Sequence, residues 1–399
     1  MISRTQLIWT TRIAILFIFR FAVHNCIRSP LVKNYVPGSD QARILFNFNF
    51  TEFFHGRTLY VLGDSTVAAG NFMLTKHPYG VDSPNVATSA EWLPTGTFSN
   101  DYSDEWLLPD GRFSNGYTTY EESLPTGRFS NGYTIADYIA IRMGSSIPRA
   151  FSGILEEQEE EEEQEEERTG INFASAGCGI LTRTPQIEYW SLSGQILHLI
   201  DTSARLDSAA IGGSIFFLSV GREDYISGEG EKSYQYTKEV VTQFEFYLKS
   251  LYSIVGARRF IINNLAPMGC FPDRKNQSTN ICDEVLNSSI GEFNKQLELA
   301  LRKFKKAYDV TIVLADTTKM FFEIFFKRLE FGFTEVYKPC CGEWDSSMKK
   351  FQCEERSHYC RNRNEYFFFD GAHTTDKANR LFVDNCLAGR VCYPIHAEI

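Results

Sequence analysis

Four short apolar runs recur along the chain, and each ends abruptly at a small or polar residue. The runs that define the pattern cover residues 59–62, 214–220, 260–265 and 311–315. Continuous apolar runs of about four to eight residues, bounded by turn residues, are typical of strands that are buried on both faces. The pattern therefore predicts neighbouring strands of a covered parallel sheet.

The stretches between these runs carry hydrophobic residues at helical spacing. Residues 231–255 and 285–308 both repeat such residues at intervals of three or four. Examples from the first stretch are Val240, Phe244, Tyr247, Leu248 and Leu251. Strands that alternate with amphipathic helices form a parallel sheet with helices on both faces. We expect a three-layer α/β/α fold with a central parallel sheet, in one domain over residues 55–393.

The net charge of −10 comes from one acidic insertion, residues 156–168. Residues 156–167 contain ten of the 50 acidic residues, so the remainder has 40 acidic against 40 basic residues. A run of like charges without spaced Asp, Asn or Gly ligands does not build a calcium site, and we interpret it as a solvated loop. Because the chain has no basic stripe, nucleic-acid binding has no electrostatic support.

A short motif, Leu-Pro-x-Gly-x-Phe-Ser-Asn, occurs three times. The copies occupy residues 93–100, 108–115 and 124–131. Only the third copy continues into a helical pattern, at residues 135–141. Three short copies rich in Pro and Gly are too few and too polar for a solenoid. We interpret residues 93–123 as a duplicated surface loop, and a role in contacting substrate stays open because long loops are often functional.

Candidate chemistry begins at the corner Gly63-Asp64-Ser65, directly after the first apolar run. Open α/β sheets bind ligands at the carboxyl edge where such a corner lies. The serine suits either a nucleophile or the N-cap of a following helix. Asp370 and His373 lie three residues apart near the other end of the chain. The carboxylate can orient the imidazole so that its second nitrogen takes a serine proton, which predicts a catalytic triad.

These residues lie in blocks that resemble the plant GDSL-type (SGNH) esterase/lipase family. The resemblance runs from about residue 59 to about residue 386. The matching positions are Gly63, Asp64, Ser65, Gly70 and Asn71, then 172–181 with Gly177, then 216–225, then Asn263, Leu265, Pro267, Gly269, Cys270 and Pro272, and finally 370–373 with Asn379. The resemblance implies the flavodoxin-like architecture of SGNH hydrolases.

The resemblance also implies an activity, the hydrolysis of carboxylic esters of lipids or other acyl compounds. Ser65 is the implied nucleophile, His373 the base and Asp370 the residue that orients it, with an acyl-enzyme as intermediate. The backbone N–H groups of Ser65 and Gly177 are the implied oxyanion donors. The implied partner is a small-molecule or lipid ester, and no cofactor or metal is expected.

Glu223 departs from the family pattern in Gly221-Arg222-Glu223-Asp224, because the family has an asparagine there as the third oxyanion donor. An ionised carboxylate accepts hydrogen bonds but donates none. The loss of one such donor costs a factor on the order of 10²–10³ in rate. Three substitutes for this donor stay open: a protonated Glu223, Arg222 and Asn263. The alternative function is a catalytically impaired relative that acts as a binding or accessory protein.

The first 25 residues have the form of a secretory signal peptide, with Arg4 and Arg12 ahead of the apolar run 13–19. Arg20 interrupts the run, and no clear small-x-small cleavage site follows. The run is well short of the roughly 20 apolar residues that a transmembrane helix needs, so we expect no membrane span. We expect a secreted, extracellular protein.

Ten cysteines and three glycosylation sequons agree with secretion. Six cysteines fall between residues 340 and 392, around the Asp370–His373 segment, where disulfides would hold that segment in place. Their pairing cannot be read from the sequence, and the absence of a tight Cys-x-x-Cys argues against zinc. Cys178 fits a small buried thiol better than a nucleophile. The glycosylation candidates are Asn49, Asn276 and Asn287.

Overall fold

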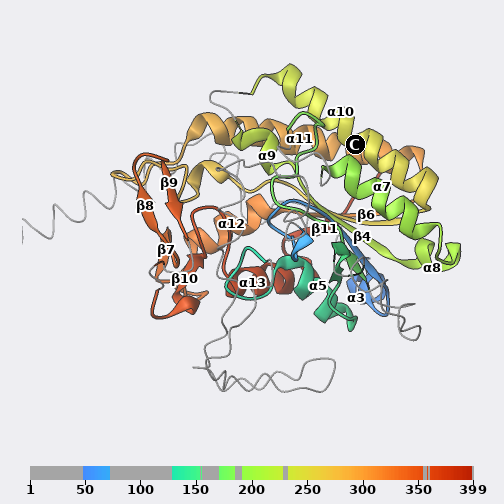
Figure 1. The fold of residues 1–399 in the computed structure, drawn as a ribbon, viewed down its shortest axis with the longest axis horizontal. Helices are drawn as coiled ribbons and strands as arrows, with labels where there is room; N and C mark the ends of the chain where they lie inside the picture. Colours follow the sequence, from blue (N-terminus) through green and yellow to red (C-terminus); the bar gives the residue numbers. More distant parts are fainter. Residues whose placement is uncertain are drawn as a thin grey trace, which may run out of the picture.

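The computed structural model describes residues 48–71, 128–152, 154, 170–184, 191–227, 232–353, 357 and 360–397. These segments hold a central sheet and the helices around it (Figure 1). The predicted signal peptide (1–25), the duplicated loop (93–123) and the acidic insertion (156–168) lie outside the described residues. All three therefore stay predictions.

The centre of the protein is a seven-stranded sheet in the order β11-β6-β5-β4-β1-β3-β2. Strands β1 to β6 are parallel, and β11 pairs antiparallel with β6. The strands are β1 (Leu59–Gly63), β2 (Arg149–Ala150), β3 (Ile171–Asn172), β4 (Ile215–Ser219), β5 (Arg259–Asn263), β6 (Thr311–Ala315) and β11 (Cys392–Pro394). The four predicted apolar strands are confirmed as β1, β4, β5 and β6, which lie side by side.

Helices cover both faces of the sheet, which confirms the three-layer α/β/α fold. In Figure 1, α10 and α11 lie together on one side of the sheet, and α5 and α13 lie on the other. The helices are α3 (Phe50–Phe54), α5 (Ile135–Met143), α7 (Leu192–Ser203), α8 (Ser208–Gly213), α9 (Arg222–Ile226), α10 (Tyr234–Ser250), α11 (Glu284–Ala307), α12 (Thr317–Phe326) and α13 (Asp376–Leu387).

The two longest helices follow the predicted periodicity. Helix α10 buries Val240, Phe244 and Leu248 and continues into a π turn, η6 (Leu251–Val255). At the start of α11, the carboxylate of Asp283 accepts a hydrogen bond of 3.0 Å from the N–H of Leu286, which caps the helix. Within the described segments, no helix combines the length and the apolar character needed to cross a bilayer.

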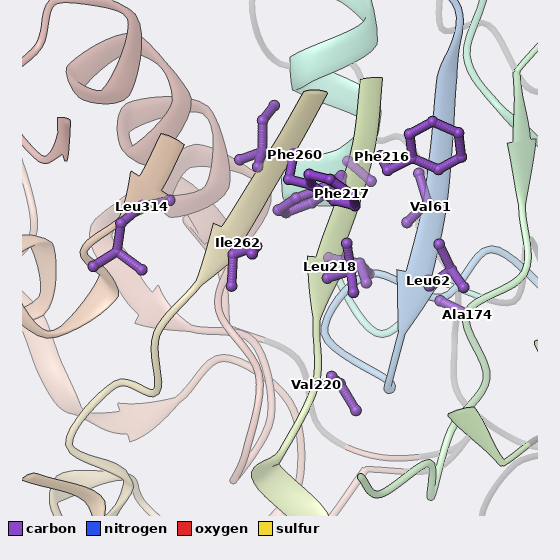
Figure 2. Packing of buried hydrophobic residues seen from close by; sticks show 14 of the residues in the cluster. Val61, Leu62, Ala174, Phe216, Phe217, Leu218, Val220, Phe260, Ile262 and Leu314 are labelled. Carbon is purple, nitrogen blue, oxygen red and sulfur yellow. The ribbon is translucent and has the colours of Figure 1, made fainter. Parts of the chain in front are cut away.

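Apolar side chains of the central strands pack side by side, as Figure 2 shows for Leu62, Leu218 and Ile262. All five residues of β1 and all five of β4 are buried. Gly63 pairs with Ser219 at the ends of these two strands. A Cβ on Gly63 would lie 2.2 Å from the carbonyl oxygen of Ser219, so only glycine lets the strands end this close together. The chain therefore leaves β1 at a tight corner on the carboxyl edge of the sheet.

Two small sheets support the segment that ends in Asp370. Strand β7 (Glu335–Pro339) pairs with β10 (Tyr366–Phe368), and β8 (Glu343–Asp345) forms a hairpin with β9 (Lys350–Gln352). Disulfides join Cys340 to Cys360, Cys341 to Cys353, Cys386 to Cys392 and Cys270 to Cys282. The six clustered cysteines thus pair with one another. Among the described cysteines, Cys178 is a buried free thiol, as expected.

Candidate active site

Ser65 lies in the corner after β1 and is 3% exposed. The N–H of Asp64 donates to the carbonyl of Ser219 at 3.0 Å, and the Asp64 carboxylate accepts from the Thr66 hydroxyl at 2.7 Å. Burial raises the pKa of Asp64 to about 6, and the hydrogen bonds from Thr66 act against this rise. Residues 65–67 form a turn, so the corner presents Ser65 as a side chain at the sheet edge instead of a helix N-cap.

The structure brings Asp370 and His373 to this serine. Nε2 of His373 lies 2.8 Å from Oγ of Ser65, and Nδ1 of His373 lies 2.8 Å from Oδ2 of Asp370. With its proton on Nδ1, the imidazole donates to the carboxylate and can accept the serine proton at Nε2. All three side chains are buried. The sequence-predicted residues therefore form one chain of hydrogen bonds.

Asp370 is held by its own turn. Its Oδ1 accepts hydrogen bonds of 2.7 Å from the N–H groups of both Ala372 and His373. Burial acts to raise the pKa of Asp370, but the charge of His373 and these hydrogen bonds outweigh it and hold the pKa below its ordinary value. The carboxylate is thus ionised at neutral pH and can stabilise an imidazolium beside it.

The third copy of the repeated motif also reaches the site, which the sequence did not predict. The ring of Phe129 packs against the imidazole of His373 with centroids 5.0 Å apart. After the histidine, the hydroxyl of Thr374 donates to Oδ1 of Asn379 at 2.6 Å. The amide of Asn379 in turn donates to the carbonyl of Tyr133 at 2.8 Å. Residues following the third copy thereby help to fix the histidine loop.

Gly177 lies in an exposed turn with a left-handed backbone, φ 76°. The end of this turn is tied to α9 by Asp224, whose buried carboxylate accepts from the N–H groups of Ile180 at 2.7 Å and Leu181 at 3.1 Å. Burial raises the pKa of Asp224 above its ordinary value. Asp224 thus connects the segment after Gly177 with the helix that carries Glu223.

Glu223 is paired with its neighbour Arg222. Oε1 of Glu223 lies 2.9 Å from Nη1 of Arg222, and the two side chains are 17% and 14% exposed. Glu223 is therefore part of a largely buried ion pair. Arg222 and Asn263, the two substitutes suggested by the sequence, both line a cavity of about 110 Å³ that also reaches His373 and Thr66.

The glycosylation candidates differ in their surroundings. Asn49 is exposed and caps α3, accepting a hydrogen bond from the N–H of Glu52 at 3.1 Å. Asn276 is exposed and lies directly before a turn. Asn287 is 2% exposed, and its Oδ1 accepts from the N–H of Gly269 at 2.8 Å. A glycan on Asn287 is incompatible with this packing, so that candidate is corrected and two remain.

Comparison with known proteins finds similar sequences over most of the chain. Residues 59–385 match the family model described as GDSL-like Lipase/Acylhydrolase. Two relatives from Arabidopsis thaliana are the GDSL esterase/lipase At5g55050, 27% identical over 370 residues (84% of this chain and 86% of the relative), and the GDSL esterase/lipase At1g71691, 28% identical over 364 residues (85% and 84%). A third, the GDSL esterase/lipase APG, is 30% identical over 235 residues, which covers 53% of this chain and 66% of the relative.

Proposed function

Since the chain belongs to the GDSL lipase/acylhydrolase family, we propose that it hydrolyses carboxylic esters through an acyl-enzyme on Ser65. The observation that carries the proposal is the unbroken chain of hydrogen bonds from Asp370 through His373 to Ser65, at 2.8 Å for each link. A serine alcohol is a weak nucleophile until a neighbouring base takes its proton. The hydrogen-bonded residues supply such a base, His373, and the carboxylate of Asp370, which orients it.

In the first step, Oγ of Ser65 attacks the ester carbonyl carbon while its proton passes to Nε2 of His373. The C–O bond to the alcohol then breaks, and Nε2 returns the proton to the departing alkoxide oxygen. In the second step, water attacks the acyl carbon and gives a proton to Nε2. The bond to Oγ breaks, Oγ recovers the proton, and the carboxylic acid leaves. Asp370 stays ionised throughout and stabilises the imidazolium.

Negative charge on the carbonyl oxygen needs donors that are already in position. The backbone N–H groups of Ser65 and Gly177 are the proposed donors. At the third position, Glu223 offers an acceptor, whereas Arg222 pairs with it and offsets its charge. We therefore propose an active enzyme whose rate is below that of a relative with an asparagine at this position.

A second candidate function follows from the same ion pair. If repulsion between Glu223 and the oxyanion dominates, the protein binds acyl esters without turning them over and acts as a binding or accessory protein. The carboxylate at this position, 17% exposed, is the specific observation in its favour. The two candidates differ in one measurable quantity, the turnover of a bound ester.

Hydrolysis of a nitrophenyl ester by the purified chain tests the proposal. We expect clear turnover by the wild type and a loss of about 10⁶-fold in kcat for Ser65→Ala, because loss of the nucleophile removes the whole triad's contribution. Ser253→Ala, an exposed serine next to α10, is the matched control and is expected to keep full activity. Equal rates for wild type and Ser65→Ala would contradict the proposal, and binding without turnover would favour the second candidate.

We also propose that the protein is secreted. The support is the set of four disulfides among the described residues, since such bridges persist in oxidising compartments. When the full chain is expressed in plant cells, we expect it in the extracellular medium, without residues 1–25. Retention of the uncleaved chain inside the cell would contradict this localisation.

A further inference from the structure

The cavity beside His373 runs between the sheet edge and the helices after β6 and β10. Its lining is mainly apolar and includes Met320, Phe321 and Ile324 of α12 and Ala378 and Phe382 of α13. The volume of about 110 Å³ gives room for roughly eight non-hydrogen atoms, since one water-sized sphere needs about 10–15 Å³. A cavity of this size and lining fits a medium-length acyl chain.

The end of the cavity at the sheet edge has polar lining residues. A chain of hydrogen-bonded side chains crosses the ends of β1, β4 and β5 there. The hydroxyl of Thr66 lies 3.1 Å from that of Ser219, and Nδ2 of Asn263 donates to Oγ of Ser219 at 3.0 Å. All three residues line the cavity. Because Thr66 directly follows Ser65, this polar end lies close to the place where an ester carbonyl would react.

Two buried polar atoms at this end have no hydrogen-bond partner among the described residues. They are Oδ1 of Asn263, an acceptor, and Nε of Arg222, a donor. Asn263 is 5% exposed, and both residues line the cavity. Buried polar groups are almost always paired, because an unpaired one loses its hydration without compensation. One bound group within reach of both atoms would have to accept from Arg222 and donate to Asn263.

A hydroxyl group meets both requirements, since it has one donor and two acceptor lone pairs. A hydroxyl group also fits if the Asn263 side-chain amide is rotated so that its NH₂ takes the place of its oxygen. The hydroxyl oxygen can then accept hydrogen bonds from both Asn263 and Arg222. A carboxylate fits poorly. Arg222 is already paired with Glu223 at 2.9 Å, and the Asp64 carboxylate lies within the electrostatic reach of both. No unbalanced positive charge is left among these groups for a second anion.

We propose that this cavity selects a medium-length acyl group with a hydroxyl near its carbonyl end, bound by Arg222 and Asn263. The proposal rests on the proposed function, because the cavity is assigned to the acyl part of the ester that Ser65 attacks. The apolar walls hold the hydrocarbon chain, and the polar end holds the hydroxyl. Arg222 and Asn263 are thus specificity-determining residues.

Binding to the Ser65→Ala variant tests this inference without turnover. The probes are methyl octanoate, methyl 3-hydroxyoctanoate and methyl 8-hydroxyoctanoate, measured by titration calorimetry. We expect the 3-hydroxy ester to bind roughly tenfold more tightly than the plain ester, as one well-made hydrogen bond allows. The 8-hydroxy ester, whose hydroxyl would meet the apolar walls, is expected to bind more weakly than both.

Variants separate the two ends of the cavity. Asn263→Leu, combined with Ser65→Ala, is expected to lose the preference for the 3-hydroxy ester while it still binds methyl octanoate, which also shows that it folds. Phe382→Ala, combined with Ser65→Ala, is the matched control and should weaken the binding of both esters by the same factor. Equal affinity of Ser65→Ala for the plain and 3-hydroxy esters would overturn the inference and leave water as the occupant of the polar end.

The outcomes also distinguish this inference from the proposed function. If the wild type hydrolyses plain and 3-hydroxy nitrophenyl octanoates equally well, the proposed function stands and the inference falls. If the wild type hydrolyses neither, but Ser65→Ala still prefers the 3-hydroxy ester, the inferred ligand class stands and the proposed hydrolysis falls.

Discussion

Nε2 of His373 lies 2.8 Å from Oγ of Ser65, although 308 positions separate the two residues in the chain. The serine comes from the corner after β1, and the histidine from a loop that follows β10. The N–H groups of Cys340 and Cys341 donate to the carbonyls of the residues just before Asp370, so two disulfides support that loop. The contact thus depends on the sheet edge, which holds Ser65, and on the disulfide-linked segment, which supports the loop of His373.

Replacing Asp370 with asparagine is expected to lower kcat/KM by about 10⁴-fold. The new amide can still accept from the N–H groups of the turn, but its NH₂ faces Nδ1 of His373. The imidazole then carries its proton on Nε2 and cannot take the serine proton. Ester hydrolysis measures the effect, with the exposed Asp309→Asn as control. A loss below tenfold would show that Asp370 does not orient the base.

Replacing Glu223 with asparagine is expected to raise kcat, because it restores a donor for the oxyanion and removes a negative charge. One donor of this kind is worth about 10²–10³-fold in rate. Glu223→Gln, which removes the charge and keeps the side-chain length, is expected to give a smaller rise. Steady-state kinetics of the wild type and the two variants measures these changes in kcat. An unchanged, high kcat in both variants would mean that position 223 does not face the oxyanion.

Removing the Cys341–Cys353 bridge by a double alanine replacement is expected to cost about 3 kcal/mol of stability, as for a bridge that closes a loop of this size. We also expect kcat to fall, because the N–H of Cys341 donates to the carbonyl of Phe369 at 2.7 Å, next to Asp370. Urea denaturation and ester hydrolysis measure the two effects. Removal of the Cys386–Cys392 bridge, at the edge strand β11, is the control and should lower stability while kcat is kept.

Asp273→Asn is expected to change how stability depends on pH. Burial raises the pKa of Asp273 from 3.8 to about 6, and the nearby Asp370 adds to the rise. Between these values the folded protein holds a proton that the unfolded chain has released, so this contribution to stability is lost as pH rises through about 6. Asparagine does not titrate and can still accept from the N–H of Phe351.

The Tm of Asp273→Asn, relative to that of the wild type, should therefore increase from about pH 4 to about pH 7. Thermal denaturation across this range measures the difference, and Asp309→Asn serves as an exposed control. A constant difference in Tm over the whole range would contradict the assigned titration.

The sequence predicted the parts of the fold that have a local cause. Residues 59–62 and 311–315 were expected as strands and form β1 (Leu59–Gly63) and β6 (Thr311–Ala315), because both are apolar runs buried between layers. The β8–β9 hairpin and the antiparallel strand β11 were not predicted. Each of these strands has only three residues, which leaves little periodicity to read, and β11 also pairs with β6, a strand far away in the sequence.

The candidate site likewise has a part that could be predicted from the sequence and a part that could not. The positions of Ser65, Asp370 and His373 could be inferred because each stands in a short motif. The contact of Phe129 with His373 could not be inferred, since it joins segments far apart in the sequence. Burial of Asn287 was missed for a similar reason: the sequon is local, but the packing that hides it comes from the turn at Gly269.

Labelling with a fluorophosphonate probe, followed by mass spectrometry of the modified peptide, tests the central claim most directly. The reagent reports an activated serine whatever the natural ester. The account predicts one phosphonyl adduct on Ser65 in the wild type, none on Ser65→Ala, and strongly reduced labelling of His373→Ala. Equal labelling of wild type and Ser65→Ala, or an adduct on another serine, would contradict it.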